Sequence, residues 1–329
     1  MNEVIVANSS GEEIRSILYK EYDFEVGDFE NSFLVTCNRA EWENIPNGAR
    51  IYIPGTEYGG IYRRLESDTK NNIVAVGGYT WRGMLQKKVI IPPPGADYAT
   101  DSGELNAVIG ARISSAFPNL FVSSSESTGI TVNNYQYDRY VTLYDGLKSM
   151  LKSKGYKMQI QYDQERCKVV ISAVPIVDYS AQIEYSSDMN ADYTMQLDST
   201  GINHLICLGQ GELRDRTVIH LYMDNNGTIS RTQTLFNENE IAMVYDYAGA
   251  AEEDLIKSGI DRLKDSANLN QFSIDLESAR DVAIGDIVGS RDYITGMVMT
   301  APVTTKIVTW RSGFEKTEYK LSDDVIVSS

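Results

Sequence analysis

The side chains that could carry acid–base chemistry are few and scattered along the 329-residue chain. Glu212 and Asp215 are a pair of nearby carboxylates, the kind of pair that a glycoside hydrolase uses as acid and base. Arg214 and Arg216 alternate with them beside an expected strand edge, a pattern typical of a solvated patch of ion pairs. We therefore interpret these four residues as surface charges and not as a catalytic site.

Histidine, the most common general base, occurs as His204 and His220 alone. His220 lies within residues 217–223, whose apolar and β-branched composition predicts a strand. A strand histidine is far more often a packing or interface residue than a base. The sequence has no phosphate-binding loop, dinucleotide-binding glycine motif, nucleophile elbow or zinc-protease helix. We expect a protein that is not an enzyme, with no catalytic, cofactor-binding or metal-binding residues.

The sequence predicts neither a metal site nor a disulfide scaffold. Residues 224–227 superficially resemble part of a calcium loop, but the alternating oxygen ligands and terminal glutamate of an EF-hand are not in place. Their Asn-Gly pair instead predicts a tight hairpin turn. Cys37, Cys167 and Cys207 are far apart and form no Cys-x-x-Cys pair, which is typical of reduced thiols in a protein made in a cytoplasm.

The overall charge excludes one class of function. Thirty lysines and arginines against 46 aspartates and glutamates give a formal net charge of −16. Direct nucleic-acid binding needs a basic face that releases counterions, so we do not expect it. The first residues lack the basic segment of a signal peptide, and no apolar run reaches the roughly 18 residues of a membrane helix.

Hydrophobic periodicity predicts a mainly β chain with an α/β insertion. Period-2 alternation, as in Phe33, Val35 and Cys37, predicts an all-β unit over residues 1–95. Prolines at 92–94 end this unit, because proline has no N–H to donate to a ladder. Residues 96–178 predict an α/β domain, with a helix from the N-cap Ser102 to before Pro118, a helix near 143–152 and a hairpin over 158–173. Strands then resume, and an acidic start at 252–254 predicts a third helix to about 268.

One pattern occurs twice. Residues 48–61 and 285–297 each read as a strand, a glycine turn and a returning strand, with Gly55 and Gly289 at the turns. Each is preceded by another strand, at 33–37 and 272–276. We interpret them as two copies of one β-barrel-like unit on either side of the insertion. The alternative is that the match reflects only the common sequence rules of hairpins.

Five short motifs, in order and with compatible spacing, resemble a tail hub family of phages and prophages of Gram-positive bacteria. They are GTEYGGI at 55–61, TWRGML at 80–85 with KKVIIPP at 87–93, Arg139-Tyr140 before the second helix, LGQGEL at 208–213 and IGDIVG at 284–289. The resemblance spans nearly the whole chain.

The resemblance implies two tail-tube-like β-barrel domains plus the small α/β domain. The first barrel would comprise residues 1–95 completed by strands in 179–235, with residues 96–178 inserted, and the last domain, 236–329, would hold a helix and the second barrel. Three copies would form a ring, in which two barrels per chain give the six units that join a sixfold tube to a threefold spike or fibre.

The resemblance also implies partners and a location. The partners would be the chain itself as a homotrimer, the tail tube or distal tail protein above, a spike, fibre or tail lysin below, and a tape measure protein. DNA would pass without specific binding and without membrane insertion. The location would be the virion tail tip or baseplate, after synthesis in the bacterial cytoplasm, and we expect no appended cell-wall hydrolase domain. A peptidoglycan-degrading tail enzyme or a receptor-binding tail protein is the alternative.

Two features allow two interpretations each. The acidic charge could line a channel and repel DNA phosphates, or it could simply be a soluble surface. Trp81, with the loop around Tyr58, could stack on a sugar, but a role for Trp81 in a barrel core or subunit contact is the stronger interpretation.

Overall fold

The computed structural model describes residues 3–18, 20–180, 192–224, 227–267, 271–275, 282–322 and 325–328. The chain divides into two compact units. The first comprises Met1–Asp192, Asp275–Ser290 and Pro302–Leu321, and the second comprises Tyr193–Ile274, Arg291–Ala301 and Ser322–Ser329.

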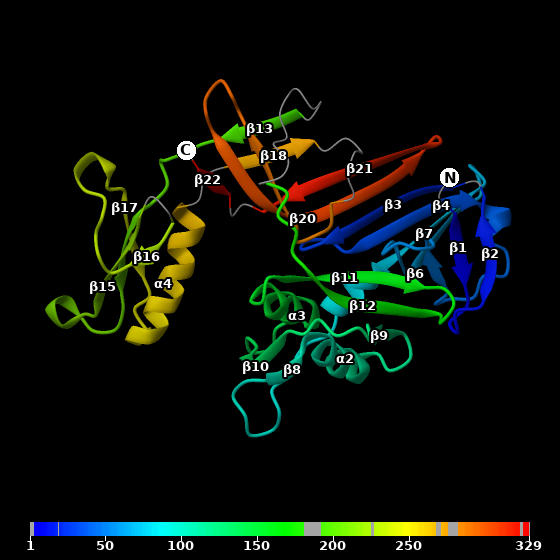
Figure 1. The fold of residues 1–329 in the computed structure, drawn as a ribbon, viewed down its shortest axis with the longest axis horizontal. Coiled ribbons are helices and arrows are strands. Elements are labelled where there is room, and N and C mark those ends of the chain that lie inside the picture. Colours follow the sequence, from blue (N-terminus) through cyan, green and yellow to red (C-terminus); the bar gives the residue numbers. More distant parts are fainter. Residues whose placement is uncertain are drawn as a thin grey trace. The chain divides into compact units, whose positions relative to one another are not determined.

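Most strands of the first unit belong to one large sheet (Figure 1). Its strand order is β19-β20-β3-β4-β7-β6-β5-β1-β2, and β21 and β22 pair with β20 outside this path. β22 and the first residues of β20 belong to the second unit. The strands are β1 (Val4–Ala7), β2 (Glu13–Ile17), β3 (Lys20–Gly27), β4 (Ser32–Asn38), β5 (Arg50–Tyr52), β6 (Gly59–Asp68), β7 (Ile73–Thr80), β19 (Ile287–Arg291), β20 (Val298–Arg311), β21 (Phe314–Leu321) and β22 (Ile326–Ser328).

The side chains of the central strands alternate between the buried and the exposed face of the sheet, as their sequences predict. Phe33, Val35 and Cys37 of β4 are all buried on one face, which confirms the period-2 pattern. The same core contains Val308 of β20 and Val4 of β1, which stand near opposite ends of the strand order, so the sheet curves over its own core. Among the described residues the strand order is an open path, so a curved sheet stands where we expected a closed barrel.

The large sheet continues beyond β3 with a strand from the C-terminal part of the chain. β3 pairs with β20, from Gly27 opposite Thr305 to Tyr22 opposite Trp310, whereas the resemblance implied that strands in 179–235 complete the first barrel. The Trp310 ring stacks on Tyr22 with centroids 6.2 Å apart. Residues 204–223 also have alternating apolar side chains, but their strands pair with each other in a sheet of the second unit.

The α/β part follows the predicted order within residues 96–178. After the short helix α1 (Trp81–Gln86) come β8 (Thr100–Glu104), α2 (Leu105–Ala116), β9 (Phe121–Ser123), β10 (Thr131–Gln136), α3 (Leu143–Lys152), β11 (Tyr156–Asp163) and β12 (Lys168–Pro175). β10 pairs with β8, and β11-β12-β9 form a separate sheet that packs against α2 and α3 (Figure 1). The hairpin and both helices are therefore confirmed.

The α/β part shares a core with the large sheet. Ile5 of β1 and Tyr52 of β5 belong to the α/β core, whereas their neighbours Val4 and Ile51 belong to the core of the curved sheet. β1 and β5 are thus buried on both faces, which explains their short, continuously buried sequences.

The helices begin and end at capping residues, and one of these differs from the residue that the sequence predicts. α2 is capped by Glu104, whose carboxylate accepts a hydrogen bond from the Ala107 N–H, and not by Ser102. Ser102 lies in β8, because residues 100–104 pair with β10 and stay extended. α3 ends near Gly155, which has φ +72° as expected for a glycine cap.

The second unit contains a helix packed on a four-stranded sheet. Its elements are β13 (Asp192–Gln196), β14 (His204–Leu208), β15 (Val218–Met223), β16 (Ile229–Ser230), β17 (Ala242–Asp246), α4 (Glu252–Ala267) and β18 (Gln271–Asp275). The sheet order is β16-β15-β14-β17, and β13 pairs with β18. Gly259 lets α4 approach closely, since a β-carbon there would lie 2.7 Å from the Cys207 Sγ. The predicted helix and hairpin strands are confirmed, whereas Asn225 and Asn226 of the predicted turn lie outside the described residues.

The repeated strand–turn–strand pattern is present in both places. β5 pairs with β6 around the turn at Gly55, and β19 is the neighbour of β20. The second turn lies at residues 292–297, with Gly296 at φ +76°, because Gly289 is inside β19. Of the preceding strands, β4 and β18 are present, and Leu276 lies outside the described residues.

Candidate functional site

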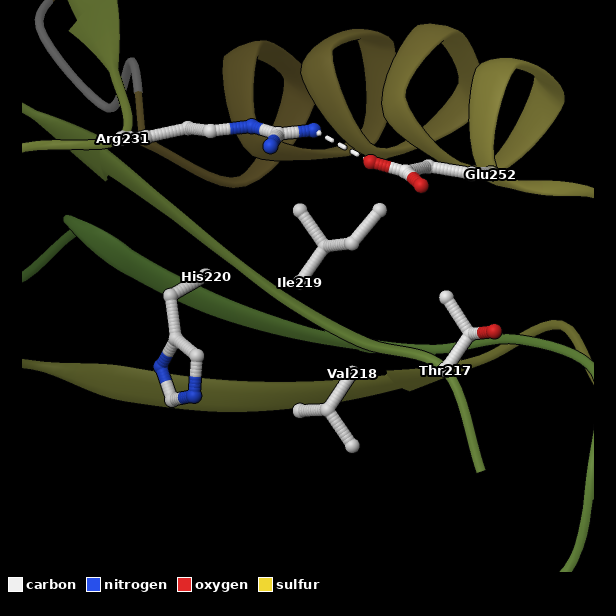
Figure 2. Close-up of a pocket in the computed structure, with 6 residues that line it drawn as sticks. All are labelled: Thr217, Val218, Ile219, His220, Arg231 and Glu252. Carbon is white, nitrogen blue, oxygen red and sulfur yellow. Dashed lines mark hydrogen bonds and ion pairs between the residues drawn. The ribbon is translucent and has the colours of Figure 1, made fainter. Parts of the chain in front are cut away.

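A pocket of about 400 Å³ lies beside β15 of the second unit. Its wall includes an ion pair in which Arg231 Nη2 lies 3.1 Å from Glu252 Oε1. Figure 2 shows that Ile219 and Thr217 lie on the side of this pair, whereas His220 and Val218 point to the opposite side of the strand. The imidazole and the carboxylate therefore do not converge on one position, as acid–base catalysis requires.

The two histidines form a chain of polar contacts. His204 Nδ1 lies 2.5 Å from Glu240 Oε1, and its Nε2 lies 2.8 Å from His220 Nδ1. The His204 ring also stacks on Tyr222, with centroids 4.3 Å apart. His204 is buried, and these contacts satisfy both of its ring nitrogens, whereas His220, the histidine for which a packing or interface role was predicted, is exposed.

The Glu212 and Asp215 carboxylates lie in an exposed loop between β14 and β15. Arg216 of this loop pairs with Asp246 of β17 and donates from Nε to the Gly209 carbonyl, 3.1 Å away. Neither Glu212 nor Asp215 lines the pocket beside β15. The two carboxylates are therefore surface groups in the structure.

No group of three or more histidine, cysteine, aspartate or glutamate side chains could hold a metal ion within the described ranges. The three cysteines are free thiols, and burial raises the pKa of the Cys37 thiol to about 12. None of the helices that the structure describes is long and apolar enough to cross a membrane.

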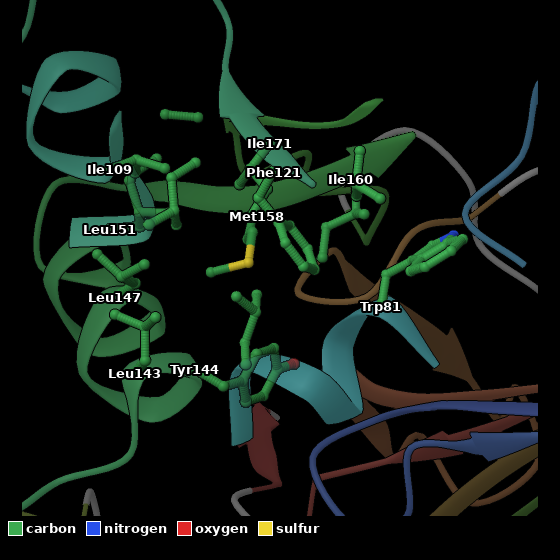
Figure 3. Close-up of a cluster of buried hydrophobic side chains, with 14 of the residues drawn as sticks. Trp81, Ile109, Phe121, Leu143, Tyr144, Leu147, Leu151, Met158, Ile160 and Ile171 are labelled. Carbon is green, nitrogen blue, oxygen red and sulfur yellow. The ribbon is translucent and has the colours of Figure 1, made fainter. Parts of the chain in front are cut away.

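Residues of two motifs named above, TWRGML at 80–85 and GTEYGGI at 55–61, lie close together in the core of the first unit. Trp81 is fully buried and stacks on Tyr162 with centroids 5.6 Å apart, so its indole is not open to a sugar. Figure 3 shows Trp81 and Tyr144 within the buried cluster of the α/β part. The next residue, Arg82, forms a buried ion pair, with Nε 2.6 Å from Glu57 Oε2.

A third motif supplies a second buried ion pair. Asp286 is 1% exposed, and its Oδ1 lies 2.5 Å from Lys157 Nζ of β11. The same carboxylate accepts hydrogen bonds from the backbone N–H groups of Val177 and Ala283. It thereby fixes residues 177–179 beside residues 285–287, which are linked by an isolated parallel bridge.

Sequence reasoning did not identify either ion pair. The available signal was a charged residue within a glycine-rich or apolar stretch, namely Arg82 in TWRGML and Asp286 in IGDIVG. Such residues are rarely buried unless they are paired. The partner could not be inferred, because Lys157 lies far from Asp286 in the sequence.

The solvent face of the large sheet has a line of acidic residues. Glu21, Asp23 and Glu25 occupy alternate positions of β3, opposite the buried Tyr22 and Phe24. Arg311 and Lys320 partly neutralise this line, with Arg311 Nη2 3.9 Å from Asp23 Oδ2 and Lys320 Nζ 3.1 Å from Glu25 Oε1.

No protein-family model matches the chain, and no curated protein matches it by sequence. Its fold, however, is similar to solved tail proteins. A tail protein from Neisseria meningitidis MC58 aligns over 98% of this chain and 96% of its own, with a TM-score of 0.52 and 13% identity. The 43 kDa tail protein of prophage MuSo2 from Shewanella oneidensis aligns over 99% of both chains, with a TM-score of 0.57 and 11% identity.

These comparisons define the class of fold. The chain has a mainly β fold with an α/β part, and this fold is similar to that of the two tail proteins along nearly the whole length. The expectation of a tail-protein fold is thereby confirmed.

Proposed function

We propose that this chain is a structural tail hub protein of a phage or phage-like particle, related to the Gram-positive family that its motifs resemble. The observation that carries the proposal is the fold likeness to two tail proteins, which covers 98% and 99% of this chain. The protein would reside in the tail tip or baseplate of the virion.

The proposed assembly is a homotrimeric ring with two tube-like β units in each chain. Three such chains would present six units to a sixfold tail tube and a threefold face to a spike, fibre or tail lysin. In the structure β5, β6, β19 and β20 are strands of the same large sheet, so the proposed two units rest on the sequence repeat at 48–61 and 285–297. A distal tail protein above the ring and a tape measure protein complete the proposed partners.

A role without catalysis is supported by how the motif residues are used. Arg82, Glu57 and Asp286 form buried structural contacts, whereas Glu212 and Asp215 lie on the surface and outside the pocket beside β15. Catalytic groups need a shared position at which a reacting atom can sit. We therefore rank a peptidoglycan-degrading enzyme below the hub.

The ring would also enclose the ejection channel. The line of Glu21, Asp23 and Glu25 on the solvent face of β3 supports this, because a carboxylate-lined wall repels the phosphates of passing DNA. DNA would then pass without specific binding.

The mass of the purified chain tests the proposal. Light scattering at several concentrations should give three times the 36.7 kDa of one chain, and two-dimensional averaging should show a ring with a central hole. A chain that stays monomeric and lyses cell walls in a zymogram, with lysis abolished in Glu212→Ala, would instead establish the enzyme.

A further inference from the structure

The strand β17 is at the edge of the sheet in the second unit. It is the last strand in the order β16-β15-β14-β17, and it pairs with β14 alone. The Ile241 carbonyl accepts a hydrogen bond from the His204 N–H at 3.1 Å, and the Tyr247 N–H donates to the Leu208 carbonyl at 2.8 Å. The backbone groups of residues 241 and 247 therefore face β14.

Three residues of β17 direct their backbone groups to the other side. The direction of the N–H and C=O groups alternates along a strand, so those of Ala242, Val244 and Asp246 point away from β14. Within the described residues, no backbone group of another segment is hydrogen-bonded to them. The edge therefore offers unpaired donors and acceptors at the spacing of a strand.

Other edge strands of the chain differ from β17. β21 contains Lys316 and Lys320, and β16 consists of two residues. Lysines on an edge and very short edge strands are means by which natural sheets prevent pairing with another chain. The sequence of β17 is Ala-Met-Val-Tyr-Asp, without lysine or proline, and its register with β14 has no irregularity. The β17 edge thus lacks these protections.

The segment that contains β17 is acidic. Residues 232–256 include six aspartates and glutamates and no lysine or arginine. Arg216 and Arg231, from outside this segment, pair with two of the six, which leaves an excess of four carboxylates over arginines. Glu238 and Glu240 lie just before β17, and Asp246 ends it. A polypeptide that pairs with this edge is therefore favoured if it is basic at both ends.

The sheet face beside the centre of β17 is aliphatic. Val244 lies opposite Ile206 of β14, and Leu208 lies opposite Val218 of β15. Figure 2 shows that Val218 and His220 point away from α4. Val244 and Val218 are 58% and 48% exposed. An aliphatic side chain on an added strand would extend this row beside Val244.

We propose that β17 is a docking site for an extended segment of a different protein, aliphatic at its centre and basic at both ends, which adds a strand to the sheet. Backbone hydrogen bonds provide the affinity, and the contacts with Val244 and the flanking carboxylates provide the specificity. A second copy of this chain is a poor partner, because each copy has a net charge of −16. The inference goes beyond the hub proposal and does not depend on it.

A synthetic peptide of valines and threonines with lysines at both ends tests the docking by fluorescence anisotropy. We expect saturable binding to the wild-type protein. A peptide with glutamates in place of the lysines should bind at least about tenfold more weakly. A lysine peptide N-methylated at the residues that face β17 should lose binding, because it lacks the backbone donors. Equal affinity for the three peptides, or no binding of the first, overturns the inference.

Two substitutions at position 244 separate the backbone edge from the side chain. Val244→Pro removes an N–H that β14 does not use, and proline is tolerated on edge strands, so the fold should persist while binding weakens at least about tenfold. Val244→Thr is the matched control, since it keeps the N–H and should bind within about threefold of wild type. Binding as tight to Val244→Pro as to Val244→Thr would overturn the inference.

Hydrogen exchange of the wild-type protein requires no substitution. In the free protein the amides of Ala242, Val244 and Asp246 should exchange faster than those of Met243 and Tyr245, and saturating lysine peptide should slow the three at least about tenfold. Slow exchange without peptide would show that the edge is already covered, and binding without slower exchange would show that the peptide lies elsewhere. Either result overturns the docking inference and leaves the hub proposal standing.

Discussion

Arg82 is a charged side chain inside a hydrophobic core. It is 4% exposed, and besides Glu57 it reaches the Met158 carbonyl with Nη2 at 3.2 Å. Burial alone would lower the pKa of the guanidinium, but the attraction of Glu57 outweighs this effect, and the pKa lies above its ordinary value. Arg82 therefore stays charged and links α1 to β11 through the core.

Arg82→Met should destabilise the first unit strongly. The substitution leaves the Glu57 carboxylate, only 16% exposed in its side chain, without its cation, and breaking a buried pair in this way costs about 3–5 kcal/mol. Urea unfolding at neutral pH measures the loss. Adding Glu57→Gln to Arg82→Met should recover part of it, because the orphaned charge is removed.

Arg64→Met is the matched control for Arg82→Met. Arg64 pairs with Glu66 at 3.4 Å, but both side chains are largely exposed, so its loss should cost at most about 1 kcal/mol. Equal losses for the two arginines would show that burial of the Arg82 pair is not what makes it important.

The sequence predicts which residues are buried better than it predicts which residues they contact. The stronger interpretation of Trp81, as a core residue, agrees with its complete burial. The neighbouring Arg82 carries no local sign of Glu57, because the pair forms only after β6, β7 and α1 bring residues 57 and 82 together. Pairing across 25 positions depends on the fold and not on spacing along a helix or strand.

At the scale of elements, Glu104 is both the last residue of β8 and the N-cap of α2. Its carboxylate caps α2 and also accepts hydrogen bonds from the Thr128 N–H at 2.8 Å and the Thr128 hydroxyl at 2.7 Å. Burial would raise the pKa of Glu104, but these hydrogen bonds outweigh burial and hold the pKa below its ordinary value. The ionised carboxylate is therefore the stabilising form.

This arrangement predicts a pH dependence. A carboxylate whose pKa is lowered in the fold contributes stability above its ordinary pKa of 4.5, and this contribution is lost as the pH falls through the folded pKa. Wild type should therefore melt at a higher temperature than Glu104→Gln at pH 7, and the gap should shrink in acid. Circular dichroism melts across this pH range measure it. A gap of constant size would show that the ionised form is not what stabilises the cap.

Element positions were more predictable than strand pairing. α3 and α4 begin and end close to the predicted residues, because capping and amphipathic spacing are local. Ser102 was a wrong N-cap because β8 pairs with β10 about 30 residues later, and that pairing keeps the chain extended up to Glu104. The pairing of β3 with β20 joins opposite ends of the chain, and nothing in the local pattern of either strand specifies it.

At the scale of the whole molecule, the acidic line on β3 works against stability. Burial raises the pKa of Asp23, Glu25 and Glu318 raise it further, and Arg311 only partly offsets them. A carboxylate with a raised pKa favours folding when it is protonated, and this contribution is lost as the pH rises through the folded pKa. Asp23→Asn should therefore raise the melting temperature at pH 7 and give no gain near pH 3.

If the acidic line faces the channel of the proposed ring, reversing its charge should make the protein retain DNA. We expect the double variant Asp23→Lys and Glu25→Lys to bind duplex DNA in a gel-shift assay at low salt, with binding that falls as salt is added, whereas wild type binds none. The matched control is Glu252→Lys with Glu253→Lys, which makes the same change of charge at the start of α4. If the control retains DNA equally well, net charge alone explains the effect and the β3 face has no special role. If only the β3 variant retains DNA, the retention is specific to the face that we place along the path of the DNA.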